Sequence, residues 1–94
     1  MVVKSNVPNL DSLDVDEHWA IWQRTNSVRP IAYARELFPG KPKGYTRIAK
    51  DLGCYASNKA TAMSCRLRGD IQTALTYEGI CDRIYDRLPD WSRW

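Results

Sequence analysis

The sequence predicts an all-α fold, a small bundle of about five helices. Apolar residues recur at intervals of three and four, which is the spacing of one face of a helix. Residues that favour helix starts and ends, such as Asp14, Gly53 and Gly69, lie at the edges of these periodic stretches. No stretch shows the alternation of apolar and polar residues, bounded by turn pairs, that is typical of β-strands.

The length and composition fit one small globular unit. A chain of 94 residues has enough core for a single domain, which we expect over residues 13–94 after a flexible lead-in over residues 1–12. Apolar residues make up 44% of the chain and charged residues 27%, so we do not expect wholesale disorder. The apolar runs are too short to span a bilayer, and Met1–Leu10 lacks the core of a signal peptide. We therefore expect a cytoplasmic protein with no membrane contact.

The first two helices are expected within the first 38 residues. Asp14 or Asp16 can cap a helix that ends near Arg24, because a carboxylate accepts hydrogen bonds from the free N–H groups of a helix start. Pro30 suits the first turn of a second helix that runs to about Phe38. The segment that follows, rich in Pro and Gly, is expected to be a loop.

Three more helices are expected at residues 45–52, 57–68 and 71–88. Gly53 is expected to end the first of them in the left-handed conformation, and Gly69 to end the second. The first two of these helices would then form a pair joined by a brief turn.

The two helices on either side of Gly53 resemble the helix-turn-helix motif of DNA-binding proteins over residues 45–68. Ile48, Ala49 and Leu52, followed by the glycine, have the apolar, small, apolar and glycine spacing of the motif's first helix and turn. The turn is one residue longer than the common one. The resemblance implies a small DNA-binding protein, a transcriptional regulator or an accessory factor, whose second helix enters the major groove of double-stranded DNA.

The second helix of this pair is expected to present residues that read bases. If its apolar side packs inward, the opposite side carries amide, cationic and small groups that suit base edges. The candidates for base contact are Asn58, Lys59, Thr61, Ala62 and Arg66. Phosphate contacts are expected near the start of the first helix, because cations and helix amino ends both bind phosphate. The candidates for phosphate contact are Lys41, Lys43, Thr46, Arg47 and Lys50.

Charge is distributed unevenly along the chain. Residues 1–23 carry a net charge of −3, residues 24–68 one of +8, and residues 69–94 one of −2. A basic middle segment attracts phosphates at long range, with an affinity that falls as salt rises. Charge by itself does not separate DNA from RNA or from an acidic protein. A solvated basic face without a partner is the alternative interpretation.

A heptad-like pattern runs through the last two expected helices. Apolar residues alternate at spacings of four and three from Ala56 to Leu88, with Asp70 as the single break. Two interpretations stay open: each helix buries its stripe within the bundle, or the last helix forms the seam of a homodimer. The candidate seam residues are Tyr77, Cys81, Ile84 and Leu88.

The chain shows no arrangement typical of catalysis or metal binding. His18, the one histidine, lies beside Trp19 on an apolar helix face and is expected in the core. Cys54, Cys65 and Cys81 lack the spacing of a zinc site and are expected to be free thiols. We therefore expect no enzymatic activity, no cofactor and no metal.

Two further functions stay open. The chain is alternatively a helical protein–protein interaction module with no nucleic-acid role. Its last helix and its tail, rich in Tyr and Trp, would then contact a partner, and its basic middle would bind an acidic protein. Non-specific RNA binding ranks lower, because no aromatic stacking platform on a sheet is expected.

Overall fold

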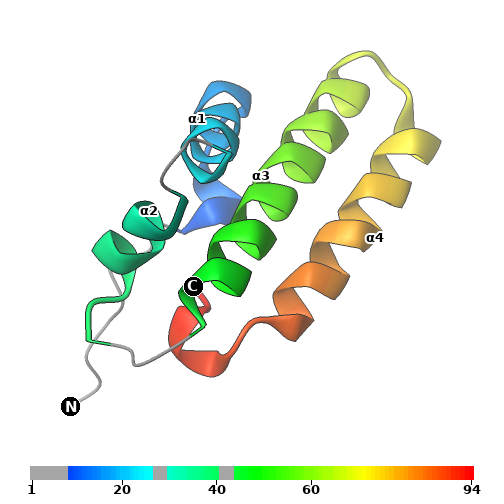
Figure 1. Ribbon diagram of the computed structural model, residues 1–94. Coiled ribbons are helices and arrows are strands. Elements are labelled where there is room, and N and C mark those ends of the chain that lie inside the picture. Colours follow the sequence, from blue (N-terminus) through cyan, green and yellow to red (C-terminus); the bar gives the residue numbers. More distant parts are fainter. Residues whose placement is uncertain (1–8, 27–29, 41–43) are drawn as a thin grey trace.

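Four α-helices and no strands make up the part of the chain that the computed structural model describes, residues 9–26, 30–40 and 44–94 (Figure 1). The all-α class is confirmed, with four helices in place of about five. The helices are α1 (Val15–Thr25), α2 (Pro30–Leu37), α3 (Tyr45–Leu67) and α4 (Ile71–Arg87). Single turns of 3-10 helix, Leu10–Ser12 and Asp90–Ser92, flank them.

α1 begins at a predicted cap. Asp14 Oδ1 accepts a hydrogen bond from the Glu17 backbone N–H at 2.8 Å, and Glu17 Oε1 accepts one from the Asp14 N–H at 3.1 Å. This capping box pairs two amide groups that a helix start otherwise leaves without partners. At the other end, Thr25 Oγ1 and Asn26 Nδ2 both donate to the carbonyl of Trp22, at 3.0 and 2.8 Å.

The predicted break at Gly53 is wrong: α3 is one continuous helix of 23 residues, so the helix-turn-helix-like pair at 45–52 and 57–68 does not form. Gly53 does not have the positive φ angle of a helix-ending glycine. Ser57, which would have begun the second helix, donates its hydroxyl to the Cys54 carbonyl within the same helix, at 3.1 Å. The residues of both expected helices therefore lie along one helix.

Close packing against α1 explains why a glycine occupies this interior position. Gly53 is buried, and a Cβ atom added to it would lie 3.1 Å from Thr25 Cβ and still closer to Thr25 Oγ1. A glycine inside a helix costs about 1 kcal/mol relative to alanine. The unbroken helix offsets this cost by keeping Tyr55 and Ala56, the next inward residues, in the core.

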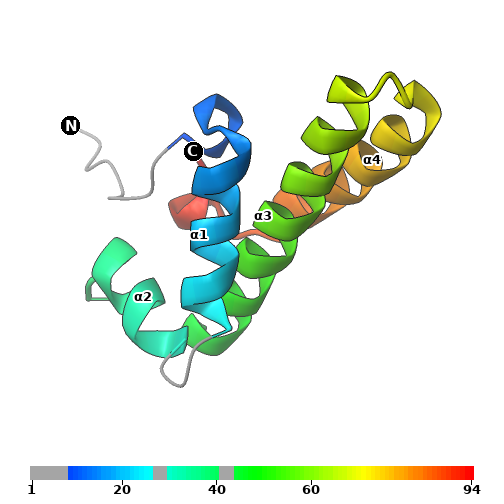
Figure 2. The same cartoon turned by 90° about the horizontal axis from the view of Figure 1, so that it is seen from above.

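α3 and α4 form an antiparallel hairpin and lie side by side (Figures 1 and 2). The predicted helix end at Gly69 is confirmed, with φ +82°. The Gly69 N–H donates to the Arg66 carbonyl at 3.0 Å and the Asp70 N–H to the Cys65 carbonyl at 2.9 Å, which is the Schellman pattern. Asp70 then caps α4 by accepting from the Thr73 N–H at 3.3 Å.

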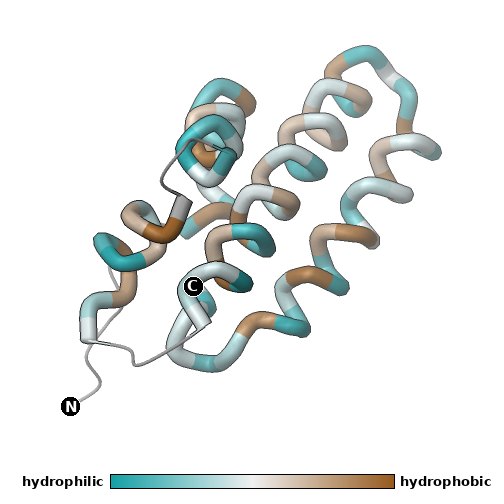
Figure 3. Tube along the Cα trace, viewed as in Figure 1, coloured by the Kyte–Doolittle hydropathy of each residue, from teal (hydrophilic) through white to brown (hydrophobic). Residues whose placement is uncertain are grey.

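α3 is the central helix, with α1 and α2 on one side and α4 on the other (Figure 2). Each helix carries both apolar and polar segments, as amphipathic helices do (Figure 3). The inward side chains of all four helices meet in one core. Its buried residues are Leu10, Ile21, Tyr33, Leu37, Phe38, Ile48, Leu52, Tyr55, Ala56, Cys81, Ile84 and Leu88.

The chain after α4 folds back onto this core. The Trp91 ring packs edge-to-face on Phe38 with 5.2 Å between ring centroids. Trp94 packs in the same way on Tyr55 and Tyr85, at 4.8 Å from each. Aromatic pairs in this arrangement contribute beyond their buried area. The Tyr85 hydroxyl also donates to the Trp94 carbonyl at 2.8 Å, so the tail is held by both packing and a hydrogen bond.

The expected lead-in is structured in its last residues. Residues 1–8 lie outside the described part of the chain, but Leu10 is buried. The Tyr55 hydroxyl donates to Asp11 Oδ1 at 2.9 Å, which joins the first 3-10 turn to α3. Within the described ranges, no helix combines the length and the apolar character needed to cross a bilayer.

Candidate nucleic-acid interface

The residues predicted for base contact do not share one exposed face. Ala62 is fully buried, and Asn58 and Thr61 are half-buried. The Asn58 amide donates to the Cys54 carbonyl at 2.7 Å, and the Thr61 hydroxyl donates to the Ser57 carbonyl at 2.9 Å. Both polar side chains therefore bond to their own helix instead of projecting toward a partner.

The two cations of the predicted reading face differ in their surroundings. Arg66 forms a two-point ion pair with Glu78 of α4, in which Nη2 lies 2.8 Å from Oε1 and Nε contacts Oε2. The guanidinium holds the pKa of the Glu78 carboxyl below its usual range. Lys59 is half-buried and lies close enough to His18 that its charge adds to the effect of burial in lowering the imidazole pKa. Arg66 thus joins α3 to α4, whereas Lys59 forms no ion pair with a described residue.

Three of the predicted phosphate contacts lie together on the amino half of α3. Thr46, Arg47 and Lys50 are exposed there, whereas Lys41 and Lys43 lie outside the described residues. α3 begins without a side-chain cap. Its amino end therefore retains N–H groups that the helix does not use, together with the positive end of the helix dipole.

One carboxylate is shared by two guanidinium groups beside this surface. Asp51 is largely buried and accepts a hydrogen bond from Arg87 Nη2 of α4 at 3.1 Å. Arg47 Nε lies 3.9 Å from the other carboxylate oxygen. Lys50, on the exposed side of the same helix turn, forms no ion pair with a described residue. Arg47, Lys50 and Arg87 therefore outnumber the one carboxylate of Asp51, although the last turns of α4 also carry Asp82 and Asp86.

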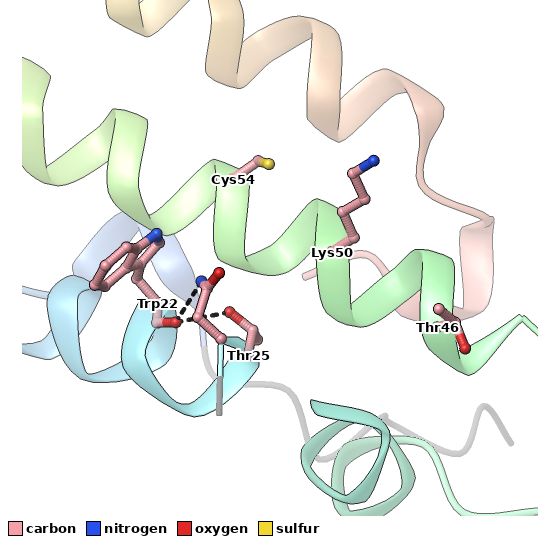
Figure 4. A pocket seen from close by; sticks show the side chains of 6 residues that line it. Trp22, Thr25, Thr46, Lys50 and Cys54 are labelled. Carbon is pink, nitrogen blue, oxygen red and sulfur yellow. Dashed lines mark hydrogen bonds between the residues drawn. The ribbon is translucent and has the colours of Figure 1, made fainter. Parts of the chain in front are cut away.

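A groove opens between α1 and α3 beside Lys50 (Figure 4). It encloses about 280 Å³. Its α3 wall consists of residues spaced by four, which places them along one face of the helix. We call it the α1–α3 groove, and its lining residues are Trp22, Thr25, Asn26, Thr46, Lys50 and Cys54. It combines an indole, an amide, hydroxyls, a cation and a thiol.

Cys54 differs from the other two cysteines in its surroundings. All three are free thiols, with Cys54 exposed and Cys65 and Cys81 buried. Burial raises the pKa of the Cys81 thiol to about 11. Across the described ranges, no group of three His, Cys, Asp or Glu side chains is placed to hold a metal ion.

The candidate dimer seam is part of the core of a single chain. Cys81, Ile84 and Leu88 are buried, and Tyr77 is half-buried. Cys81 Sγ lies 3.6 Å from the Tyr55 carbonyl of α3, to which it donates. The heptad-like stripe therefore joins α3 to α4 within one molecule, so a homodimer would need a different surface.

The sequence did not indicate the α1 side of the groove. The sequence pattern places Trp19 on an apolar face, yet Trp19 and Trp22 are 36% and 39% exposed. The four-residue spacing of Thr46, Lys50 and Cys54 would have indicated the α3 wall of the groove, but only if residues 45–67 had been predicted as one unbroken helix. No protein-family model, curated protein or solved structure matches the chain. The function of the groove is therefore inferred from the residues that line it.

Proposed function

We propose that the protein binds DNA through the α1–α3 groove and the adjoining amino half of α3, mainly by contacts to the phosphate backbone. The observation that supports this proposal is the position of Lys50. It projects beside the groove with Thr46 one turn before it, next to two arginines that share the single carboxylate of Asp51. Lysine, hydroxyl groups and helix amino ends are the usual phosphate contacts in protein–DNA complexes.

This mode of binding favours an accessory DNA-binding factor over a sequence reader. Four of the five side chains that were expected to read bases are buried, bonded to their own helix or paired with Glu78, and the fifth, Lys59, is half-buried. Phosphate contacts fix the position of a protein on DNA but carry no sequence information directly. We therefore expect affinity that depends strongly on salt and weakly on base sequence.

The test is a salt titration of binding to random duplex DNA, for the native chain and for Lys50→Ala. Each phosphate contact contributes about 0.9 to the slope of log K against log salt on duplex DNA. Lys50→Ala is expected to reduce that slope by about this amount and to weaken binding to every sequence alike. Selection of the tightest sequences from the pool should enrich no motif.

Arg66→Ala is the matched control for this titration. It removes the same charge from the same helix, sixteen residues further on, which is about 24 Å along the axis. We expect its slope to stay close to that of the native chain. No binding at low salt, or equal losses from Lys50→Ala and Arg66→Ala, would contradict binding at the groove.

A protein–protein interaction module is the second candidate function, and one observation favours it. The tip of the α3–α4 hairpin, remote from α1 and α2 in Figure 2, exposes three large apolar side chains. Leu67 is 83% exposed, Ile71 44% and Leu75 55%. Neighbouring exposed apolar residues are typical of protein contact surfaces. The tail does not offer such a surface, because Trp91 and Trp94 pack on the core.

A second copy of the chain is the partner that tests this candidate directly. Sedimentation velocity over a range of concentrations would show self-association of the native chain, which Leu67→Ser and Leu75→Ser should abolish without loss of helix. Gln72→Ser, at an exposed polar position on the same turn of α4, is the control. A chain that stays monomeric at high concentration would contradict self-association through the tip.

A further inference from the structure

Contacts to DNA phosphates do not explain why two tryptophans of α1 are exposed. Trp19 and Trp22 pack edge-to-face, with ring centroids 5.6 Å apart, and each is more than a third exposed. On the tail, by contrast, Trp91 and Trp94 are half-buried and pack against the core. The exposed indole that lines the groove is that of Trp22.

We infer that the α1–α3 groove holds an unpaired DNA strand, with one base stacked on the Trp22 indole and a phosphate of the strand at Lys50. The inference rests on the proposed function and names the form of DNA that the groove takes. Combining an aromatic surface with a cationic groove is the general solution for binding single strands without sequence preference. Two features of the groove argue for it over a duplex.

The first feature is the placement of the indole within the groove rather than on a flat face. In a duplex the faces of the bases are covered by their neighbours, and only base edges and phosphates meet a protein. An indole at the contact surface can stack only on a base that has left the stack. Trp22 therefore adds affinity for an unpaired strand and little for a duplex.

The second feature is that an indole and a cation from two different helices line the same groove. Trp22 comes from α1 and Lys50 from α3, yet both line a groove of about 280 Å³ (Figure 4). A strand lying along the groove would place a base at Trp22 and a phosphate at Lys50. Asn26 also lines the groove, and its Nδ2 is bonded to the Trp22 carbonyl, which leaves Asn26 Oδ1 to accept from a base amino or imino group.

The experiment compares oligothymidylate with a duplex of the same length at equal salt, measured by fluorescence anisotropy of labelled DNA. We expect the single strand to bind at least tenfold more tightly than the duplex. Trp22→Ala should weaken binding of the single strand by about 5- to 150-fold, the range given by stacking of one base on an aromatic ring. Trp22→Phe, which keeps a ring, should recover most of that loss, and circular dichroism should show unchanged helix in both variants.

Two further readouts locate the strand. Lys50→Ala should lower the salt slope on oligothymidylate by about 0.7, the value for one phosphate of a single strand. Alkylation of Cys54, the exposed thiol of the groove, should slow when oligothymidylate is bound. Gln72→Ser, at an exposed polar position of α4, serves as a control that should leave both readouts unchanged.

The outcomes separate this inference from the proposed function. Equal or tighter binding of the duplex, with no loss on Trp22→Ala but a loss on Lys50→Ala, would overturn the stacking of an unpaired base and leave backbone binding in place. Absence of binding to either form at low salt would overturn both. An acidic polypeptide that protects Cys54 better than oligothymidylate would also overturn the inference, because the groove would then favour a protein partner.

Discussion

Gly53 of α3 lies directly against the Thr25 side chain of α1. The Thr25 hydroxyl is held in place by its hydrogen bond to the Trp22 carbonyl, and the residue is buried. The closest approach of α1 to α3 therefore depends on the absence of a side chain at position 53. Gly53, which the sequence pattern predicts as a helix end, instead allows α1 and α3 to pack closely where they cross.

Gly53→Ala is expected to destabilise the protein by about 1–3 kcal/mol, as overpacking of a close contact does. The loss should appear although alanine favours a helix by about 1 kcal/mol. Gly79→Ala is the matched control, because Gly79 lies inside α4 and a Cβ there would meet nothing within 4 Å. That change should stabilise by about 0.5–1 kcal/mol. Urea denaturation followed by circular dichroism measures both.

Thr25→Ala in the Gly53→Ala background tests the cause of the loss. Removing the hydroxyl that a Cβ at position 53 would strike should restore part of the stability, so that the two changes are not additive. Additive losses would mean that the contact with Thr25 is not what excludes alanine.

The stability of the fold is expected to fall as the pH drops below about 6.5. His18 is fully buried, and neither ring nitrogen has a hydrogen-bond partner among the described residues. Burial, aided by the charge of Lys59, lowers the pKa of His18 in the folded state. The unfolded state then binds more protons below the ordinary pKa of about 6.5, and stability declines by at most about 1.4 kcal/mol per pH unit.

Unfolding free energies measured by urea denaturation between pH 7.5 and 5.5 test this expectation. Carboxylates near His18 act in the opposite direction on its pKa, and they belong to Glu17, Asp11 and Asp14. His18→Leu is the control, since the chain has no other histidine, and it should flatten the profile in this window. A native profile that is already flat would show that His18 is solvated or hydrogen-bonded in the folded protein.

Thiol chemistry should separate the three cysteines. Cys54 is expected to react rapidly with a neutral disulfide reagent in the folded state, because it is exposed. Cys65 and Cys81 should react only after unfolding, since both are buried and the raised pKa of Cys81 leaves little thiolate. The count of fast-reacting thiols in native protein should be one, and Cys54→Ser should reduce it to zero.

Trp94 is expected to contribute through its ring and not through its N–H group. Trp94→Ala should cost about 2 kcal/mol, less than for a fully buried aromatic residue, because the side chain is only half-buried between Tyr55 and Tyr85. Its Nε1 is buried without a hydrogen-bond partner among the described residues. Trp94→Phe should therefore be nearly neutral in urea denaturation. Equal losses of unfolding free energy from Trp94→Ala and Trp94→Phe would mean that the indole nitrogen forms a hydrogen bond.

Local signals predicted much of the fold because they act over a few residues. The cap at Asp14 and the helix end at Gly69 each depend on backbone groups within one turn. Gly53 could not be assigned in the same way. A glycine that ends a helix and a glycine that admits a neighbouring helix have the same local sequence, and only the position of Thr25 distinguishes them.

The candidate site was less predictable because charge pairing is set by tertiary contacts. Arg66 is exposed and cationic in the sequence pattern, yet Glu78, twelve residues away, meets it across the hairpin. Arg87 reaches Asp51 from the far end of α4. These tertiary pairings decide which cations stay unpaired and can bind a partner. The sequence alone therefore does not show that Lys50 is one of them.

The central position of α3 has a consequence for how the protein opens. α1, α2 and α4 all pack on this one helix, and the tail contacts it through Tyr55. Melting any turn of α3 near Gly53 would therefore release both sides of the core together. We expect amide hydrogen exchange in the middle of α3 to require global unfolding, whereas the amides next to Gly69 exchange through fraying of the hairpin tip.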